Sequence, residues 1–309
     1  MNSSCFLGQN TLIGVCMNSL RYFFLLPVFL IMGASCSHHG AEVELKDGKG
    51  VLNCEDYKQL IVAPVIIDGK KCHLLVDTGA SHTLLRKDLV KKFWPGKSLK
   101  YMGGKITSNI ESPLFLASVR SLSSEPLEVK NFNLLVADLP HLGKMGSAPV
   151  AGMLGMDIMG SFPMLIDVEG GKVTFFSKAP ADAELKALGA VKVPIQRDGN
   201  HVRAKLLMDG KPMQLIIDTG ATQSCIPRKS WNKKTKRMQS KMEWVNVNGI
   251  SQINEFEYGE IDRLKWGNMT FPNMVVFFET PEKVMGGDVL RKGKLFLDRR
   301  LNQAWWIPN

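Results

Sequence analysis

The hydrophobic positions of the chain fall into short runs separated by turn residues. Two runs, residues 74–76 and 215–217, consist of Leu, Ile and Val, and an Asp-Gly pair stands a few residues before each of them. Short apolar runs bounded by Gly and Asp predict strands, and Asp-Gly between two such runs predicts a hairpin turn. Each run ends at an aspartate, so Asp77 and Asp218 are both expected to follow the second strand of a hairpin.

These hairpins belong to an internal repeat. The stretch DGKKCHLLVDTGASHTLL, which begins at Asp68, returns as DGKPMQLIIDTGATQSCI at Asp209, an offset of 141 residues that also relates the two motif aspartates. A second pair of similar segments follows: GMLGMDIM resembles VMGGDVL, and LID at 165–167 resembles FLD at 296–298, with an offset of 131 residues. Similarity at a fixed spacing indicates duplication of one structural unit. The second copy is about ten residues shorter between its motifs.

Apolar character is also continuous near the N-terminus, over residues 22–32. Arg21 precedes this run, and small residues ending in Cys36 follow it. The run is short for a membrane span, and small residues before a cysteine are typical of a bacterial lipoprotein signal. We therefore predict an export signal over residues 1–36 with Cys36 as the lipidated residue. A plain secretory leader and an uncleaved anchor are the alternatives. Lipoprotein signals usually have Leu, Val or Ile three positions before the lipidated cysteine, and this chain has Gly33 there.

The leader and the repeat together divide the chain. We expect a tether over residues 37–53, a first lobe over 54–178, a linker with a short helix over 179–192, and a second lobe over 193–309. Met17, shortly before the leader's basic residue, is an alternative start of translation.

Composition is that of a globular protein with a basic balance. Of 309 residues, 45% are hydrophobic and 22% charged, and the formal net charge is +10. The leader holds a single formal charge, that of Arg21, so the rest of the chain carries +9. Clusters of Lys and Arg on such a chain either attract anionic lipid headgroups, surface polysaccharide or acidic substrates, or form an ordinary solvated face, which is the interpretation that charge runs favour. Zinc-finger spacing and aromatic-interleaved basic motifs are missing, so we predict no nucleic-acid partner.

Cysteine and histidine suggest neither a metal site nor a thiol nucleophile. Three cysteines follow the leader region, Cys54, Cys72 and Cys225, and their pairing is left open by the spacing. The six histidines show no metal-ligand spacing. We expect no cofactor and no metal.

The repeated motifs resemble those of the retropepsin-like aspartic peptidases, and the GMLGMD stretch is similar to that of bacterial exported members. The motifs that carry the resemblance are Asp77-Thr78-Gly79-Ala80, Asp218-Thr219-Gly220-Ala221, and the apolar-apolar-glycine motifs that end at Gly155 and Gly286. The resemblance covers nearly all of residues 55–309. It implies an all-β, bilobal pepsin/retropepsin-like β-barrel pseudo-dimer with few short helices, and places the glycine motifs beneath the active site.

The resemblance also implies a function. Two carboxylates a few ångströms apart share one proton, so one can activate water as a base while the other donates a hydrogen bond to the scissile carbonyl. Asp77 and Asp218 are thus expected to form the catalytic dyad of an aspartic endopeptidase that cleaves peptides or proteins in the bacterial cell envelope. The duplication favours a monomer with an intramolecular pseudo-dimer over pairing with lobes of another chain. The alternative function is a catalytically silent peptide- or protein-binding lipoprotein on the same fold.

The residues that follow the aspartates have expected supporting roles. Thr78 and Thr219 supply hydroxyls that brace the loops, and Gly79 and Gly220 permit a close backbone turn.

Neither Ala80 nor Ala221 offers a hydroxyl that would favour the ionised carboxylate, which predicts a mildly acidic to neutral optimum. A substrate-covering hairpin is expected from each lobe, around Gly103-Gly104 in the first and Asn248-Gly249 in the second.

Overall fold

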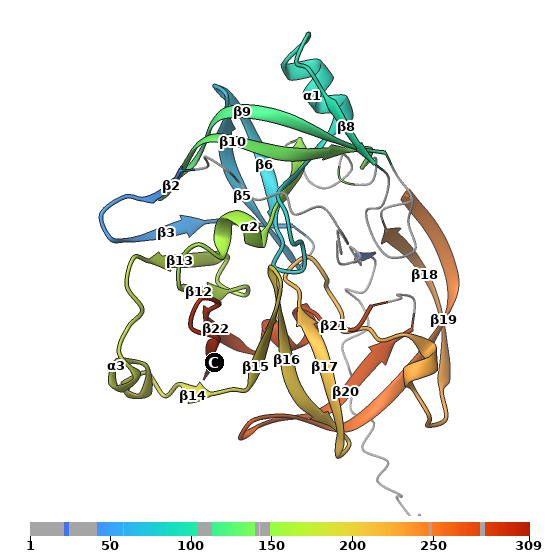
Figure 1. Ribbon diagram of the computed structural model, residues 1–309. Coiled ribbons are helices and arrows are strands. Elements are labelled where there is room, and N and C mark those ends of the chain that lie inside the picture. Colours follow the sequence, from blue (N-terminus) through green and yellow to red (C-terminus); the bar gives the residue numbers. More distant parts are fainter. Residues whose placement is uncertain are drawn as a thin grey trace, which may run out of the picture.

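The computed structural model describes residues 22–24, 42–57, 59–103, 113–139, 142, 149–246, 249–278 and 282–309. Within these ranges the chain forms three β-sheets and a few short helices (Figure 1). No helix in the described part is long and apolar enough to cross a membrane. Cys36 lies outside the described residues. Of the predicted leader only strand β1 (Tyr22–Phe24) is described, and it pairs in parallel with a strand of the second lobe.

A nine-stranded sheet forms the first lobe. Its strands are β2 (Glu42–Leu45), β4 (Glu55–Tyr57), β5 (Leu60–Ile67), β6 (Lys70–Val76), β7 (Leu84–Arg86), β8 (Lys100–Gly103), β9 (Leu114–Ser124), β10 (Leu127–Ala137) and β11 (Val150–Leu154). The helices of this lobe are α1 (Lys87–Phe93) and α2 (Met156–Met159). Strands β5 and β6 form the predicted hairpin, and its turn residues Asp68 and Gly69 have φ of 43° and 79°. Positive φ at both central residues is what a type I′ hairpin turn requires.

An eight-stranded sheet forms the second lobe. Besides β1 its strands are β15 (Ile195–Asp198), β16 (His201–Met208), β17 (Lys211–Ile217), β18 (Lys236–Asn246), β19 (Gly249–Trp266), β20 (Met269–Phe277) and β21 (Val284–Met285). The lobe also contains the 3-10 turn η3 (Arg228–Ser230) and helix α4 (Gly287–Leu290). The β16–β17 hairpin repeats β5–β6, and Asp209 and Gly210 have φ of 48° and 82°. The duplication of sequence is therefore also a duplication of backbone conformation.

A third sheet joins the two lobes. Its six strands are, in order, β14 (Val191–Lys192), β23 (Gln303–Pro308), β22 (Gly293–Asp298), β12 (Met164–Asp167), β13 (Lys172–Phe176) and β3 (Lys49–Asn53). Each half of the chain supplies three of them. In the antiparallel pair β12–β22, Leu165 lies opposite Phe296, its own counterpart in the repeat. The pseudo-two-fold axis passes through this pair, and the predicted all-β bilobal pseudo-dimer is confirmed.

The core is continuous across the halves. One cluster of buried apolar side chains includes Leu74 and Leu154 of the first lobe as well as Leu215 and Trp306 of the second half. Burial of one such side chain contributes roughly 1.5–3 kcal/mol. The lobes are therefore held together by shared apolar packing as well as by the joining sheet.

The predicted tether needs correction, because strands β2 and β3 fall inside residues 37–53. Strand β2 pairs antiparallel with β10, and β3 pairs antiparallel with β13. The alternation of Glu with Val and Leu in β2 gives one exposed and one half-buried face, and Leu52 of β3 is buried. A charged stretch with period-two alternation is a strand signal rather than a tether signal.

The predicted linker contains the short helix expected there, α3 (Asp182–Ala187). The Glu184 carboxylate accepts a hydrogen bond from the N–H of Ala181 at 2.7 Å and so satisfies one of the free donors at the start of the helix. The end of the predicted linker, β14, belongs to the joining sheet.

Candidate active site

The two Asp-Thr-Gly loops meet between the lobes. Each follows a strand flanked by a parallel neighbour, β11 beside β6 and β21 beside β17. The Asp77 N–H donates to the Leu154 carbonyl at 3.1 Å, and the Asp218 N–H donates to the Met285 carbonyl at 3.0 Å. The two carboxyl groups lie within hydrogen-bond reach of each other, and the residues are only 2% and 1% exposed. The structure thus brings the two predicted dyad residues together.

Thr78 and Thr219 lock the loops to each other. The Thr78 hydroxyl donates to the Ile217 carbonyl at 2.8 Å and accepts from the Thr219 N–H at 3.0 Å. The Thr219 hydroxyl donates to the Val76 carbonyl at 2.6 Å and accepts from the Thr78 N–H at 3.0 Å. All four bonds cross from one half of the chain to the other. The threonines therefore brace the site between the lobes, rather than each within its own loop.

Gly79 and Gly220 are needed for a different reason than the sequence suggested. Neither has a positive φ, so the turn itself does not demand glycine. A Cβ on Gly79 would lie 2.4 Å from Cγ of Asp218, and a Cβ on Gly220 would lie 2.6 Å from Cγ of Asp77. Each glycine thus leaves the space that the opposite carboxylate occupies, a contact between distant segments that local turn chemistry does not reveal.

The electrostatics of the pair follow from its burial. Oδ1 of Asp77 accepts the N–H groups of Gly79 and Ala80, both at 2.9 Å, and Oδ1 of Asp218 accepts the N–H of Gly220 at 2.8 Å. Burial raises the pKa of Asp77 to about 6, although these N–H groups and Asp218 oppose the shift. The pKa of Asp218 is raised well above its usual range, first by burial and then by the charge of Asp77. The pair therefore still retains one proton as the pH rises through about 6.

Comparison with protein-family models agrees with this geometry. A model described as aspartyl protease matches residues 63–158, and a model of the aspartyl protease of gag polyproteins matches residues 204–292. Each match contains one of the two loops. The chain belongs to the retropepsin-like aspartyl proteases. It is a duplicated member, and its protease domains imply a peptide substrate. A search among curated proteins gives no match.

The glycine motifs of this retropepsin-like chain support the loops from behind. Gly155 follows β11 and Gly286 follows β21. A Cβ on Gly155 would lie 2.5 Å from the His82 carbonyl carbon, and one on Gly286 would lie 2.6 Å from the Gln223 backbone. Both glycines therefore let the parallel strand approach the chain that leaves the aspartate loop.

A second pair of carboxylates was not singled out from the sequence. Asp157 accepts hydrogen bonds from the backbone N–H and hydroxyl of Thr83 at 2.8 and 2.7 Å. At the matching place Asp288 accepts from the Ser224 hydroxyl at 2.7 Å. Burial raises the pKa of Asp288 to about 6. Both acids lie in the repeated GMD and GGD motifs, so the repeat itself was the signal that could have found them.

His201 is a further buried group near the site. It begins β16, is 3% exposed, and lies against the backbone of Gly79 in the loop of the other lobe. Burial, and next the charge of Arg203, lower its pKa to about 4. Leu60 occupies the equivalent position in the first copy of the repeat. This difference between the two copies is the feature of the sequence that could have singled out His201.

The flap residues are placed only in part. Gly103 ends β8, which pairs antiparallel with β9, and its φ of 108° suits glycine. Gly249 begins β19 opposite Asn246 of β18. Gly104 and Asn248 lie outside the described residues. The strand pairs β8–β9 and β18–β19 are present, and a role as substrate covers stays a prediction.

The cysteines do not contribute to the site. Cys54 and Cys72 are free thiols, and no disulfide joins either of them to Cys225. Burial raises the pKa of Cys54 and of Cys72 to about 12, which makes them poor nucleophiles. Across the described ranges no group of three His, Cys, Asp or Glu side chains is arranged to hold a metal ion.

Replacement of Thr219 by Val should destabilise the protein, because the N–H of Thr78 and the carbonyl of Val76 would be left buried without their partner. An unsatisfied buried group costs about 1–3 kcal/mol. Thr219→Ser keeps the hydroxyl and is the matched control. Urea unfolding should show a clear loss of unfolding free energy for the Val variant only. Equal stability of the two variants would contradict the proposed brace.

Asp288→Asn should flatten the pH dependence of stability. Asp288 binds its proton more tightly in the folded than in the unfolded protein, because burial raises its pKa to about 6. Its contribution to the unfolding free energy is therefore complete below about pH 4 and is lost as the pH rises through about 6. The loss is on the order of 2 kcal/mol. Asparagine does not ionise, so unfolding free energies measured at about pH 4 and pH 7 should differ less in the variant. An unchanged difference would refute this assignment.

Proposed function

We propose that the protein is an aspartic endopeptidase whose catalytic residues are Asp77 and Asp218. The observation that carries the proposal is the pair of buried carboxyl groups within hydrogen-bond reach, each held by the Asp-Thr-Gly loop of its own family domain. Family membership supports the general protease function, and the dyad supplies the chemistry that such a function needs.

The proposed reaction uses the single proton that the pair retains. The ionised carboxylate takes a proton from a water molecule as that water attacks the peptide carbonyl, and the protonated carboxyl donates a hydrogen bond to the carbonyl oxygen. The pair then returns a proton to the leaving amine. Backbone N–H groups stabilise the ionised form of either carboxylate, those of Gly79 and Ala80 at Asp77 and those of Gly220 and Ala221 at Asp218, so the loops support either member of the pair as the base.

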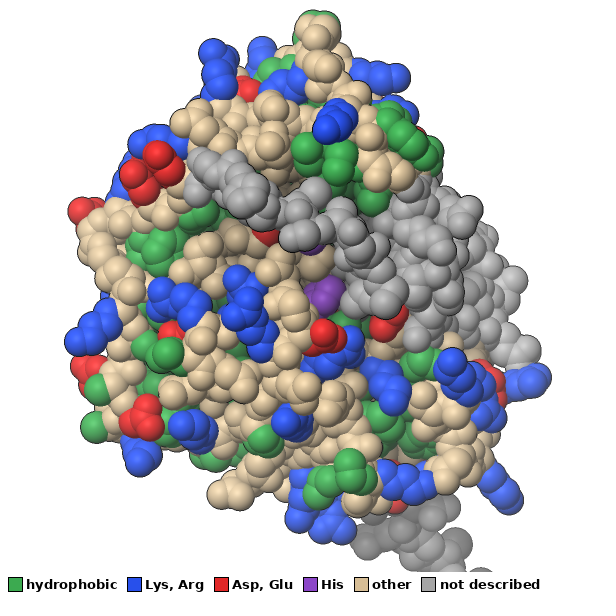
Figure 2. All heavy atoms as spheres, viewed as in Figure 1, with side chains coloured by type: hydrophobic (Ala, Val, Ile, Leu, Met, Phe, Trp, Pro, Cys, Tyr) green, Lys and Arg blue, Asp and Glu red, His purple; other side chains and the backbone are tan. Residues whose placement is uncertain are grey.

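We place this activity in the bacterial cell envelope, with the chain anchored through Cys36. The support is the basic residue, short apolar run and small residues that precede this cysteine. Lys and Arg side chains are spread over the face shown in Figure 2, in keeping with the net charge of +10. Such a surface suits a protein that works beside anionic envelope components.

Asp77→Asn and Asp218→Asn should each abolish cleavage of a peptide library, because an amide can neither accept the proton of water nor share the proton of the pair. Asp138→Asn changes an exposed carboxylate that pairs with Lys87 at 3.8 Å, and should cleave like wild type. Cleavage that persists in both dyad variants would refute the assignment. A wild-type protein that binds peptides without cleaving them would indicate the silent binding protein instead.

The pH–rate profile should rise with an apparent pKa near 6 and remain high toward neutral pH. Below that pH both carboxyls are protonated, and no base is available for the attack of water. Measurement of kcat/KM between about pH 3 and pH 8 checks this. Ala80→Ser, which adds a hydroxyl donor after Asp77, should move the acid limb to lower pH. A wild-type optimum below about pH 4 would contradict the expectation.

A further inference from the structure

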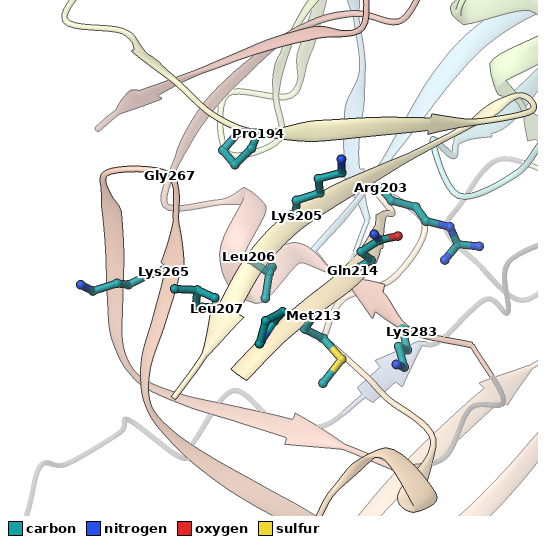
Figure 3. Close-up of a pocket in the computed structure, with 11 residues that line it drawn as sticks. Pro194, Arg203, Lys205, Leu206, Leu207, Met213, Gln214, Lys265, Gly267 and Lys283 are labelled. Carbon is teal, nitrogen blue, oxygen red and sulfur yellow. The ribbon is translucent and has the colours of Figure 1, made fainter. Parts of the chain in front are cut away.

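The outer face of the second lobe carries a hollow that the proposed peptidase function does not use. Its volume is about 760 Å³, and it is built on the solvent-facing side of the β16–β17 hairpin beside β19. The cationic side chains that line it are Arg203, Lys205, Lys265 and Lys283. Leu207 and Met213 are among its apolar lining. Figure 3 shows Arg203 and Lys205 on β16, Met213 on β17 and Lys265 on the neighbouring strand.

Strand register explains how charge and apolar surface alternate here. Lys205 lies opposite Gln214, and Leu207 lies between Pro212 on β17 and Lys265 on β19. Leu207 is 39% exposed, whereas Leu206 and Met208 on either side of it are buried. The hollow therefore presents an exposed apolar patch with lysines on the adjoining positions.

The positive charge of the hollow is largely uncompensated. Its lining contains no Asp or Glu among the residues that the structure describes. Arg203 donates from Nε to Asp198 at 2.8 Å. The three lysines form no ion pair within the described part of the chain. Clustered cations without acidic partners create a positive potential that attracts anions.

The duplication provides an internal comparison. The β5–β6 hairpin of the first lobe carries a matching hollow of about 610 Å³. Leu207 has its counterpart there in Ile66, which is similarly exposed at 41%. Lys205, however, corresponds to Pro64, and the strand neighbour equivalent to Lys265 is Ser123. The hollow and its apolar centre thus belong to the repeated fold, whereas these two lysines occur only in the second copy and are not required by the hairpin.

We propose that the hollow of the second lobe binds an anionic amphiphile, a molecule with a phosphate headgroup and an alkyl chain. Lys205, Lys265 and Lys283, which surround the apolar patch in Figure 3, turn their flexible side chains toward the headgroup, and the alkyl chain covers Leu207 and Met213. The volume lies within the usual range of small-molecule sites. The site is separate from the dyad, so it does not depend on the proposed peptidase activity.

The test is titration calorimetry of the full-length protein with dodecyl phosphate below its micelle concentration, at low salt. The double variant Lys205→Gln/Lys265→Gln should bind at least tenfold more weakly, and added salt should weaken binding to wild type. Leu207→Ser should also lose affinity. The matched controls are Lys71→Gln and Ile66→Ser in the first hollow, which should bind as wild type does.

Three outcomes would overturn the proposal. One is equal affinity of wild type and the double lysine variant, and another is equal affinity for dodecyl phosphate and uncharged dodecyl maltoside. The third is inorganic phosphate binding as tightly as dodecyl phosphate, which would leave the apolar patch without a role.

Vesicles separate the sources of such a ligand. Flotation with phosphatidylglycerol vesicles, but not phosphatidylcholine vesicles, that requires Lys205 and Lys265 assigns the amphiphile to a bilayer. Dodecyl phosphate binding without lysine-dependent flotation assigns it to a free molecule.

Discussion

Two carboxyl groups held within hydrogen-bond reach in a buried site are the constraint on which the rest of the structure depends. Burial and mutual repulsion both penalise a second negative charge, so the pair retains a proton, as the raised pKa values of Asp77 and Asp218 show. Close approach also requires that each loop leave space for the opposite side chain, which Gly79 and Gly220 provide. The chemistry and the steric requirement are two consequences of one contact.

That contact joins residues 141 positions apart, so it exists only if the two halves are held in fixed relation. The threonine bonds do this at the site, the β12–β22 pair does it in the joining sheet, and the continuous apolar core does it between them. These links lie close to or on the pseudo-two-fold axis. A substitution near the axis therefore changes the positions of both carboxylates.

The sequence predicted what is local or repeated. Asp68-Gly69 predicted a hairpin through its turn chemistry, and the register of the repeat singled out Asp77 and Asp218. It did not predict contacts between distant segments. The steric role of Gly79 depends on a carboxylate from the other half, and the burial of His201 depends on its approach to the opposite loop. Strand β2 lies in the stretch predicted as a tether, because its two glutamates make the segment polar overall although Glu alternates with Val and Leu as in a strand.

Duplication within one chain frees the two copies to diverge away from the axis. In a symmetric pair of identical chains, every substitution appears on both sides of the site. Here Leu60 and His201 occupy the same position of the repeat, and in the described part of the chain it is the Asp77 loop that has this imidazole against its backbone. Pro64 and Lys205 differ in the same way on the outer face. The loops, threonines and glycines are alike in the two copies because each forms part of the contact between them, so a substitution in either copy alters that contact. Residues that touch only one copy are free to acquire separate roles.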